Sequence, residues 1–390
     1  MISNLRWHLE YAEADYDLLW ENCLFVMDTN ILLNFNRYTN STNKDFLTVL
    51  EKISERLWVP HQVLLEYQYN VTNVQNDLKN SYGKISGIVK KLFNPALEET
   101  KKEFKQYRNH PFIKVSAFLE NAQKLIEDFK QDLEETEKSH ESEIIQRKET
   151  VENIHKLFKN VGEGFTEQEL KAILQSGQER YKILRPPGFE DRLKKDNEWK
   201  QYSNLIVPDR FGDFVIWKQI LKYAKTNKKP IIFVTDDEKE DWWRVLKGKK
   251  MGPRLELIDE FSTEVSLDET NKLPFHMYTG DTFLHYAAKK YLNEELTSSV
   301  EEAKDVRLSI DEFTAEQLSL AGLTNDQEEY IGEMIKTAMA LNSELGRAAQ
   351  DQFDVLQNKS DNDISYRLKN YSLDMNVLID WLEVKINNEQ

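Results

Sequence analysis

The chain has 390 residues, of which 40% are hydrophobic and 11% aromatic, which is enough to build a folded core and excludes a disordered protein. Its formal charge of −16 excludes a protein that coats nucleic acid through a broad basic surface. A single cysteine, a mean hydropathy of −0.66 and an acidic N-terminus exclude a disulfide framework, a membrane span and a signal peptide, so we expect a soluble, cytoplasmic protein.

The first part of the chain alternates between helical and strand patterns. Apolar residues recur every three or four positions over residues 5–20, which predicts an amphipathic helix. The apolar run 24–27 predicts a buried strand that ends at Asp28. The alternation continues with a helix at about 45–55, a strand at 57–59 and a helix that contains Glu66. Such an alternation is typical of a parallel sheet with helices on its faces.

Residues 74–184 differ from the segments on either side. They are rich in charge, poor in strand formers and predicted to be helical, with breaks near Asn94-Pro95, His110-Pro111 and Gly162–Gly164. The pattern indicates a helical insertion into the sheet domain. Two interpretations agree with it: a solvated arm packed on the core, or an arm that grips a partner or substrate.

Sheet patterns return after the insertion. Residues 213–225 predict a helix with one broad apolar face, and residues 230–235 predict a second central strand, followed by Asp236 and Asp237. Further elements are predicted as strands at 255–258 and 275–278 and a helix at 282–292. We therefore expect an α/β core assembled from two parts of the chain, residues 1–73 and 185–295.

The last segment, residues 296–390, predicts an acidic helical C-terminal module. It contains 19 acidic and 8 basic residues, so it carries −11 of the total charge and leaves −5 for everything before it. Most of the negative charge therefore need not face a substrate of the core. The module is compatible with homo-oligomerisation, with recruitment of a protein partner, or with shielding of an active site.

Acidic side chains follow two of the predicted parallel strands. The carboxyl ends of such strands meet at one edge of the sheet, which would bring Asp28 close to Asp236 and Asp237. Asp213, at the start of a helix, and Glu66 are further candidates. Crowded carboxylates raise one another's pKa unless a cation joins them, and an all-oxygen ligand set favours Mg²⁺ or Mn²⁺ over zinc. Two such ions suit phosphodiester hydrolysis.

Six segments resemble, in this order, the motifs of PIN-like domains, in particular a subgroup often found in bacteria. They are FVMDTNILLNF (25–35), WVPHQVLLEYQ (58–68), RPPGFEDRLKK (185–195), DRFGDFVIWKQIL (209–221), IIFVTDDEKEDWW (231–243) and GPRLELIDEF (252–261). The resemblance spans roughly residues 20–290 and implies a Rossmann-like fold with Mg²⁺- or Mn²⁺-dependent nuclease activity. It implies catalytic, metal-binding roles for Asp28, Glu66, Asp213 and Asp237.

Other roles remain open on the sequence. Asp236 is also expected among the metal ligands, and Asp241 and Asp209 compete for such a place. Asn30 is the usual polar helper of the first motif, and Thr235 belongs to the fourth. We expect these two side chains to contact the substrate, together with Arg185 and Lys194 beside the Pro-Pro-Gly loop, although ordinary solvated cations explain the last two equally well.

The function that the resemblance implies is metal-dependent cleavage of RNA, with single-stranded DNA as the second choice. An endonuclease in a bacterial defence or toxin-like role agrees with the family resemblance. The main alternative is a PIN-like scaffold that binds nucleic acid or protein without cleaving it. A phosphatase of the haloacid dehalogenase type is disfavoured because Asn30 stands where its second acid would be, and nucleotide-binding glycine motifs are missing from the sequence.

Overall fold

The computed structural model describes residues 13–110, 112–194, 198–246, 249–265, 273–320, 323–362, 375, 378–379, 381–382 and 384–386. The chain divides into two compact units, residues 1–304 and 305–390. Their boundary lies inside helix α11 (Thr297–Leu320), slightly beyond residue 296, where the sequence pattern places it. The helix expected over residues 5–20 is present in part as α1 (Glu13–Asn22), and its first residues lie outside the described ranges.

The centre of the first unit is a parallel sheet of four strands in the order β2-β1-β5-β8. Its strands are β1 (Leu24–Met27), β2 (Leu57–Trp58), β5 (Ile231–Val234) and β8 (Phe275–Tyr278), all close to the predicted positions. Every residue of β5 is buried, as the continuous apolar run requires of a strand covered on both faces. The predicted mixed α/β fold with a central parallel sheet is confirmed.

Aromatic contacts show which helices cover each face of the sheet. On one face, Trp20 of α1 packs on Phe25, with ring centroids 5.2 Å apart, and on Phe283 of α10 (Gly280–Tyr291). On the other, Trp217 of α8 (Gly212–Asn227) packs on Phe275 at 5.0 Å. Helices α2 (Thr29–Asn34) and α3 (Asn40–Lys52) follow β1. The core is therefore a three-layer arrangement around one short sheet.

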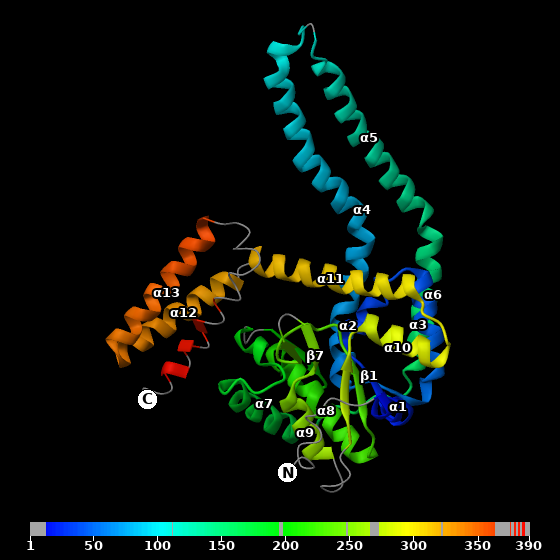
Figure 1. The fold of residues 1–390 in the computed structure, drawn as a ribbon, viewed down its shortest axis with the longest axis vertical. Helices are drawn as coiled ribbons and strands as arrows, with labels where there is room; N and C mark the ends of the chain where they lie inside the picture. Colours follow the sequence, from blue (N-terminus) through cyan, green and yellow to red (C-terminus); the bar gives the residue numbers. More distant parts are fainter. Residues whose placement is uncertain are drawn as a thin grey trace. The chain divides into compact units, whose positions relative to one another are not determined.

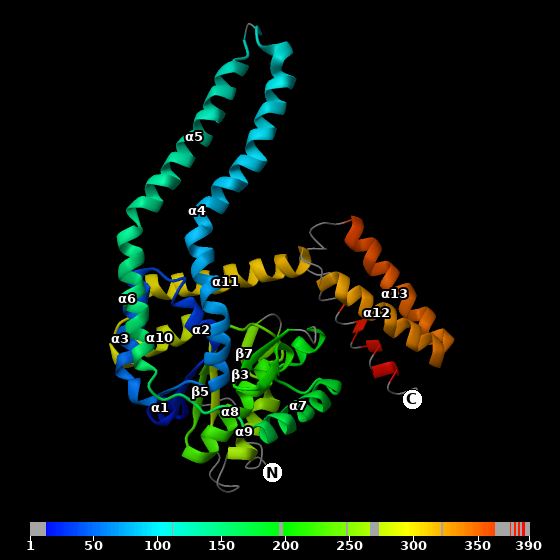
Figure 2. The same ribbon diagram turned by 180° about the vertical axis from the view of Figure 1, so that it is seen from behind.

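The insertion is a helical hairpin, the arm, that extends from the core (Figures 1 and 2). Helix α4 (His61–Glu103) runs outward, α5 (Val115–Ser139) returns beside it, and α6 (Glu141–Leu157) leads back to the core. The expected break at Asn94-Pro95 is wrong, because α4 continues through Pro95. Pro95 has no backbone N–H, so one carbonyl in the preceding turn lacks its usual helical donor. Because Pro95 is exposed, water can hydrate that carbonyl instead. The outgoing half of the arm is therefore a continuation of α4, whose first turns pack in the core.

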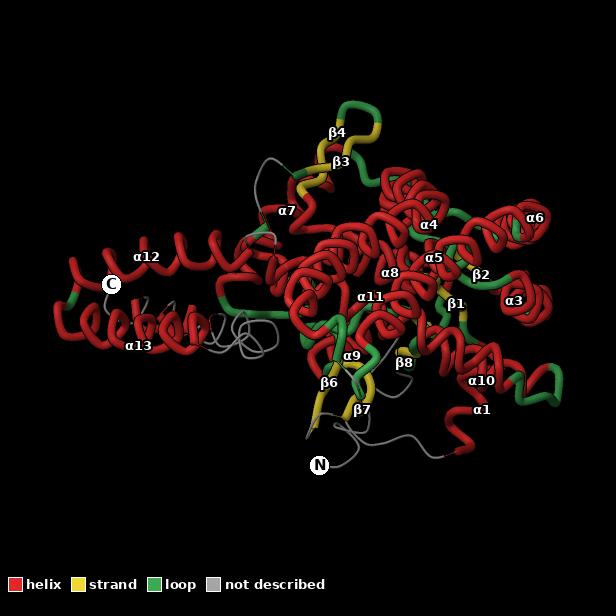
Figure 3. Tube along the Cα trace, turned by 90° about the horizontal axis from the view of Figure 1, so that it is seen from above, coloured by secondary structure: helices red, strands yellow, loops and turns green. Residues whose placement is uncertain are grey.

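Two antiparallel hairpins accompany the core, seen as yellow strand pairs in Figure 3. They are β3 (Trp199–Tyr202) with β4 (Leu205–Pro208), and β6 (Trp243–Leu246) with β7 (Lys249–Pro253). The strand expected at 255–258 is wrong, since these residues begin helix α9 (Leu255–Val265). Leu257, Phe261 and Val265 are buried at intervals of four residues, which is helical spacing.

The second unit contains a helical pair, α12 (Leu323–Leu341) and α13 (Ser343–Asn362), which lie against each other (Figure 3). Ile331, Met334 and Phe353 are buried, whereas Met339 and Leu341 remain partly exposed. The helices predicted for this acidic segment are therefore present in its described part. Among the described residues, no helix is both long and apolar enough to cross a membrane.

Candidate active site

The ends of β1 and β5 lie side by side at one edge of the sheet. Met27 pairs with Val234, so Asp28 and Thr235 follow at the same level. The Asp28 backbone N–H donates to the Val234 carbonyl at 2.9 Å, and the Thr235 hydroxyl donates to Asp28 Oδ2 at 2.6 Å. The parallel pairing thus joins residues that are more than 200 positions apart in the sequence.

Asp28 is buried and is held through both carboxylate oxygens. Oδ1 accepts from the Thr29 backbone N–H at 2.7 Å, where α2 begins, and Oδ2 accepts from Asn30 Nδ2 at 2.9 Å as well as from Thr235. The structure places Asn30 and Thr235 as donors to Asp28, and Thr235 has no exposed surface. Their position suits orientation of the Asp28 carboxylate rather than contact with a substrate.

Glu66 reaches the same edge from the first turns of α4. Its Oε2 accepts from the Thr29 hydroxyl at 3.0 Å, and its Oε1 accepts from Gln62 Nε2 at 2.9 Å. Burial raises the pKa of Glu66, partly offset by these hydrogen bonds. One threonine therefore links the two acids: its backbone binds Asp28 and its side chain binds Glu66.

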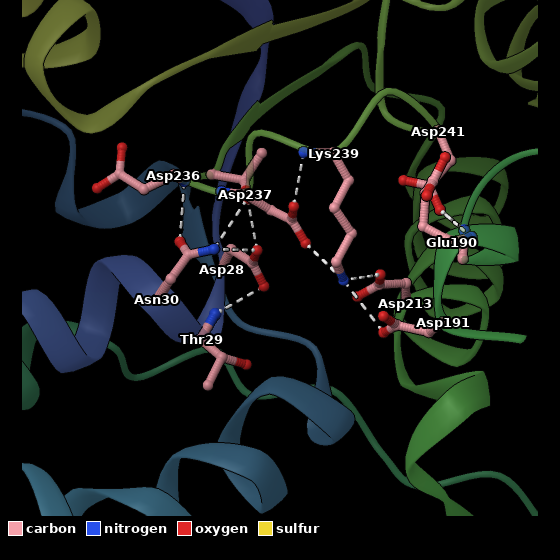
Figure 4. A network of polar contacts seen from close by, with 12 residues as sticks. Asp28, Thr29, Asn30, Glu190, Asp191, Asp213, Asp236, Asp237, Lys239 and Asp241 are labelled. Atoms are coloured by element: carbon pink, nitrogen blue, oxygen red, sulfur yellow. Dashed lines mark hydrogen bonds and ion pairs between the residues drawn. The ribbon is translucent and has the colours of Figure 1, made fainter. Parts of the chain in front are cut away.

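Asp213 and Asp237 are joined by a lysine that the sequence patterns did not single out. Lys239 Nζ lies 3.3 Å from Asp213 Oδ2, 3.1 Å from Asp237 Oδ2 and 3.1 Å from Asp191 Oδ2 (Figure 4). Burial alone would lower the pKa of Lys239, but the three carboxylates outweigh it and hold that pKa well above its usual value. Lys239 is therefore a permanent cation at the centre of the acids.

Asp191 is the second residue that the sequence did not reveal as part of the site. It lies in the short 3₁₀ helix Phe189–Leu193 after the Pro-Pro-Gly loop and also pairs with Lys194 Nζ at 2.7 Å. Burial opposes its ionisation, yet Lys239 and Lys194 lower the pKa of Asp191 overall. For Lys239, the sequence did contain a signal: the lysine stands among acids in the segment that follows the buried strand β5.

Asp28 and Asp213 are more difficult to ionise than ordinary aspartates. Burial, with smaller contributions from Asp213 and Glu66, raises the pKa of Asp28 to about 8 despite the hydrogen bond from Thr235. Burial also raises the pKa of Asp213 to about 6, even though Lys239 lowers it. Burial is thus the main obstacle to ionising Asp28 and Asp213, and neighbouring carboxylates add to it.

Two candidate acids point elsewhere. Asp236 Oδ1 accepts from the Gly280 backbone N–H at 2.7 Å and Oδ2 from Asn34 Nδ2 at 2.8 Å, and Figure 4 shows its carboxylate directed away from Lys239. Asp241 is fully buried, and its Oδ2 accepts from the backbone N–H groups of Gly188 and Glu190. Asp241 thereby anchors the loop that leads to Asp191.

Asp209 and Arg185 also have other partners. Asp209 Oδ2 pairs with Lys200 of β3 at 2.7 Å. Arg185 Nη2 lies 3.8 Å from Glu260 Oε2 of α9, and among the described residues Arg185 forms no ion pair with the acids around Lys239. Lys194 is the basic residue of the Pro-Pro-Gly loop that the structure brings to the acids. Trp242 and Trp243, which follow the acids, are buried and pack in the core.

A family model described as a PIN-like domain matches residues 24–257, more than half of the chain. The chain belongs to the PIN-like domain family. Comparisons with curated proteins and with solved structures find no match. The matched range runs from β1 to the start of α9, so it includes the arm and the acids Asp28, Glu66, Asp191, Asp213, Asp237 and Asp241. The resemblance seen in the sequence is confirmed, and with it a fold of the nuclease type.

The chemistry of the PIN-like site fits a divalent metal ion. All the donors are carboxylate oxygens, which Mg²⁺ and Mn²⁺ prefer, and a bound cation would favour the charged forms of Asp28 and Asp213 that burial disfavours. Within the described ranges, no three acidic, histidine or cysteine side chains are already gathered closely enough to ligate one ion. Binding would therefore require the carboxylates to turn toward the ion.

Gly212, at the start of α8, provides room for Glu66. A Cβ at this position would lie 2.5 Å from Glu66 Oε1. We expect Gly212→Ala to displace the Glu66 carboxylate and to lower any metal-dependent activity of this site roughly tenfold, with a change in stability of about 1–3 kcal/mol. Activity and thermal unfolding of the variant would check this, and Gly83→Ala, in open space on the arm, is the matched control. Unchanged activity would contradict the expectation.

The raised pKa of Asp28 predicts how stability depends on pH. A carboxyl whose pKa rises from 3.8 to about 8 on folding contributes stability below the lower value and loses it as pH rises toward the higher one. In chelator, the melting temperature of Asp28→Asn relative to wild type should therefore increase from pH 5 to pH 9. Differential scanning calorimetry would measure it. A difference that does not change with pH would show that Asp28 is ionised normally.

Proposed function

We propose that this PIN-like domain protein is a metal-dependent nuclease that hydrolyses phosphodiester bonds, with RNA as the preferred substrate. The observation that carries the proposal is the convergence of acids from separate elements at one sheet edge. Asp28 follows β1, Glu66 lies on α4, Asp213 on α8 and Asp237 after β5. The crowding is electrostatic as well as geometric, because Asp213 and Glu66 both raise the pKa of Asp28.

The carboxylates of Asp28, Glu66, Asp213 and Asp237 would hold Mg²⁺ or Mn²⁺. When bound, such ions lower the pKa of water and stabilise the leaving oxygen of a phosphodiester. The chain's own hydrogen bonds prepare this site: Thr29, Asn30 and Thr235 fix the Asp28 carboxylate, and the Lys239 backbone N–H holds Asp237 Oδ1 at 2.9 Å. These hydrogen bonds keep the two acids at the sheet edge, from which their carboxylates would turn toward an ion.

Lys239 divides the acids into two electrostatic groups. Its ammonium pairs with Asp213, Asp237 and Asp191, whereas the donors that the described residues place within hydrogen-bond distance of Asp28 and Glu66 are all neutral. The first ion would therefore bind on the Asp28–Glu66 side. Asp213 and Asp237 would hold a second ion, as two-metal catalysis requires, at the position that the Lys239 ammonium occupies in the free protein.

The test is an incubation of the purified protein with labelled single- and double-stranded RNA and DNA, in Mg²⁺, in Mn²⁺ and in chelator. We expect cleavage of RNA that chelator stops and that Asp28→Asn abolishes while the far-UV circular dichroism spectrum stays unchanged. Internal labels distinguish endonuclease products from those of an exonuclease. Cleavage that persists in chelator would reject the metal-dependent mechanism.

One observation favours a second function, a non-catalytic scaffold that binds nucleic acid or protein. Three carboxylates already share the Lys239 cation, so that part of the site is partly neutralised without a metal. A scaffold should bind RNA or a protein partner and leave every substrate intact in all metal conditions. Measuring both cleavage and binding of the same labelled substrates distinguishes the two functions.

A role in bacterial defence, or as a toxin, is a further proposal that rests on family analogy. Induced expression of the wild type should then arrest growth of a bacterial host, and Asp28→Asn should relieve the arrest at equal protein level. For the acidic C-terminal unit we propose self-association or recruitment of a partner. Light scattering of the purified protein tests the first of these, since a monomer at all concentrations would exclude it.

A further inference from the structure

The distal part of the arm is basic, although the protein as a whole is acidic. Residues 90–114 contain seven lysine and arginine residues and three glutamates, a net charge of +4 in a chain of −16. Lys101 and Lys102 pair with Glu98 and Glu99. The other five basic side chains are exposed and have no ion-pair partner among the described residues; they are Lys90, Lys91, Lys105, Arg108 and Lys114.

Exposed aromatic rings lie in this stretch of the arm or directly after it. Phe112 is 89% exposed, and Phe93, Tyr107 and Phe118 are each about half exposed. The turn that carries Phe112 is ordered by His110 Nδ1, which accepts from the backbone N–H of Phe112 at 3.2 Å. Exposed rings beside unpaired cations are the combination on which nucleic-acid bases stack while their phosphates are neutralised.

Helix α4 connects this surface to the active site without interruption. Glu66 lies near its beginning, and Glu103 is its last residue, 37 positions later, a distance of about 55 Å along the helix. Figures 1 and 2 both show α4 and α5 extending together from the core. A nucleic acid bound at both places would have to be about 16 base pairs long if it were duplex DNA, at roughly 3.4 Å per pair.

We propose that the distal arm is a second nucleic-acid contact, which grips the phosphate backbone of a long substrate while a remote phosphodiester lies at the carboxylates. The five unpaired basic residues, Lys90, Lys91, Lys105, Arg108 and Lys114, supply the phosphate contacts, and Phe112 supplies a stacking ring. This inference rests on the proposed nuclease function. The basic surface of the distal arm also provides local positive charge. A chain of charge −16 would otherwise repel a polyanion such as nucleic acid.

The test compares two variants of the full chain with equal charge. One replaces the five arm residues by Gln; the control replaces five exposed lysines outside the arm by Gln, namely Lys44, Lys52, Lys171, Lys225 and Lys289. Binding of labelled RNA and DNA of about 30 nucleotides, single- and double-stranded, is measured by fluorescence anisotropy in chelator over a range of salt. The arm variant should bind at least about tenfold more weakly, with a salt slope reduced by about 3, and the control within about twofold of wild type.

Substrate length provides a second measurement. In Mn²⁺, the arm variant should raise KM for duplexes of about 30 base pairs and leave kcat unchanged, whereas duplexes of about 8 base pairs, roughly 27 Å long, should be cleaved as by wild type. Phe112→Ala should weaken binding of single strands several-fold.

Three results would overturn the inference. They are equal loss of binding in the arm and control variants, equal binding by the arm variant and wild type, and arm-dependent binding to vesicles of anionic phospholipid without binding to nucleic acid. Failure of the proposed function is recognised separately. If wild type cleaves no substrate in any metal, the nuclease is rejected, while the anisotropy comparison still decides whether the arm binds nucleic acid.

Discussion

Replacing Asp237 by Asn should lower nuclease activity by roughly 10³-fold, whereas Asp236→Asn, one position earlier, should retain activity within a few-fold of wild type. The two acids are neighbours in sequence but have different surroundings. Asp237 Oδ2 lies 3.1 Å from Lys239 Nζ among the converging acids, and Asp236 accepts hydrogen bonds from Gly280 and Asn34. The sequence alone leaves both as candidate metal ligands.

Cleavage rates at saturating Mn²⁺, measured together with thermal unfolding, check this pair of variants. Asp236→Asn should cost about 1–2 kcal/mol of stability, because one of its two buried acceptors becomes a donor facing Asn34. Asp237→Asn retains its backbone hydrogen bond to the Thr235 hydroxyl and should unfold near the wild-type temperature. Loss of activity in Asp236→Asn with normal folding would indicate that Asp236, rather than Asp237, binds the metal.

Replacing Lys239 by Met should destabilise the metal-free protein and increase its response to metal. Removing the ammonium leaves Asp191, Asp213 and Asp237 without their shared cation. Breaking a fully buried ion pair costs about 3–5 kcal/mol, and because about a third of the Lys239 side chain is exposed we expect on the order of 2 kcal/mol. A divalent ion that binds the vacated carboxylates should restore this stability by mass action.

Melting temperatures with and without Mn²⁺, and the number of ions bound in isothermal titration calorimetry, measure the effect independently of activity. We expect Lys239→Met to melt a few degrees lower in chelator and to bind one more Mn²⁺ per chain than wild type. Lys250→Met is the matched control, because Lys250 pairs with the partly exposed Glu238 outside the acid cluster. Equal metal stoichiometry in wild type and Lys239→Met would show that Lys239 does not occupy the place of an ion.

The parallel core and the meeting of its strand ends were predictable because both follow from short sequence patterns. Four continuous apolar residues before Asp28, and a similar run before Asp236 and Asp237, indicate buried strands. Parallel pairing then forces the residues after them to the same edge. Helix α9 was mistaken for a strand because four residues are too few to distinguish period 2 from period 3.6.

The sequence by itself determined the kinds of elements in the core, the acids that follow its strands and the presence of a helical arm. Only the tertiary structure decided how those acids are used. It turned Asp236 toward Gly280 and Asn34, assigned Asp241 to a loop, and placed Lys239 between carboxylates from three elements. The physical reason is range: hydrophobic period and strand ends are local properties, whereas the direction of a polar side chain depends on donors and charges that distant segments bring to it.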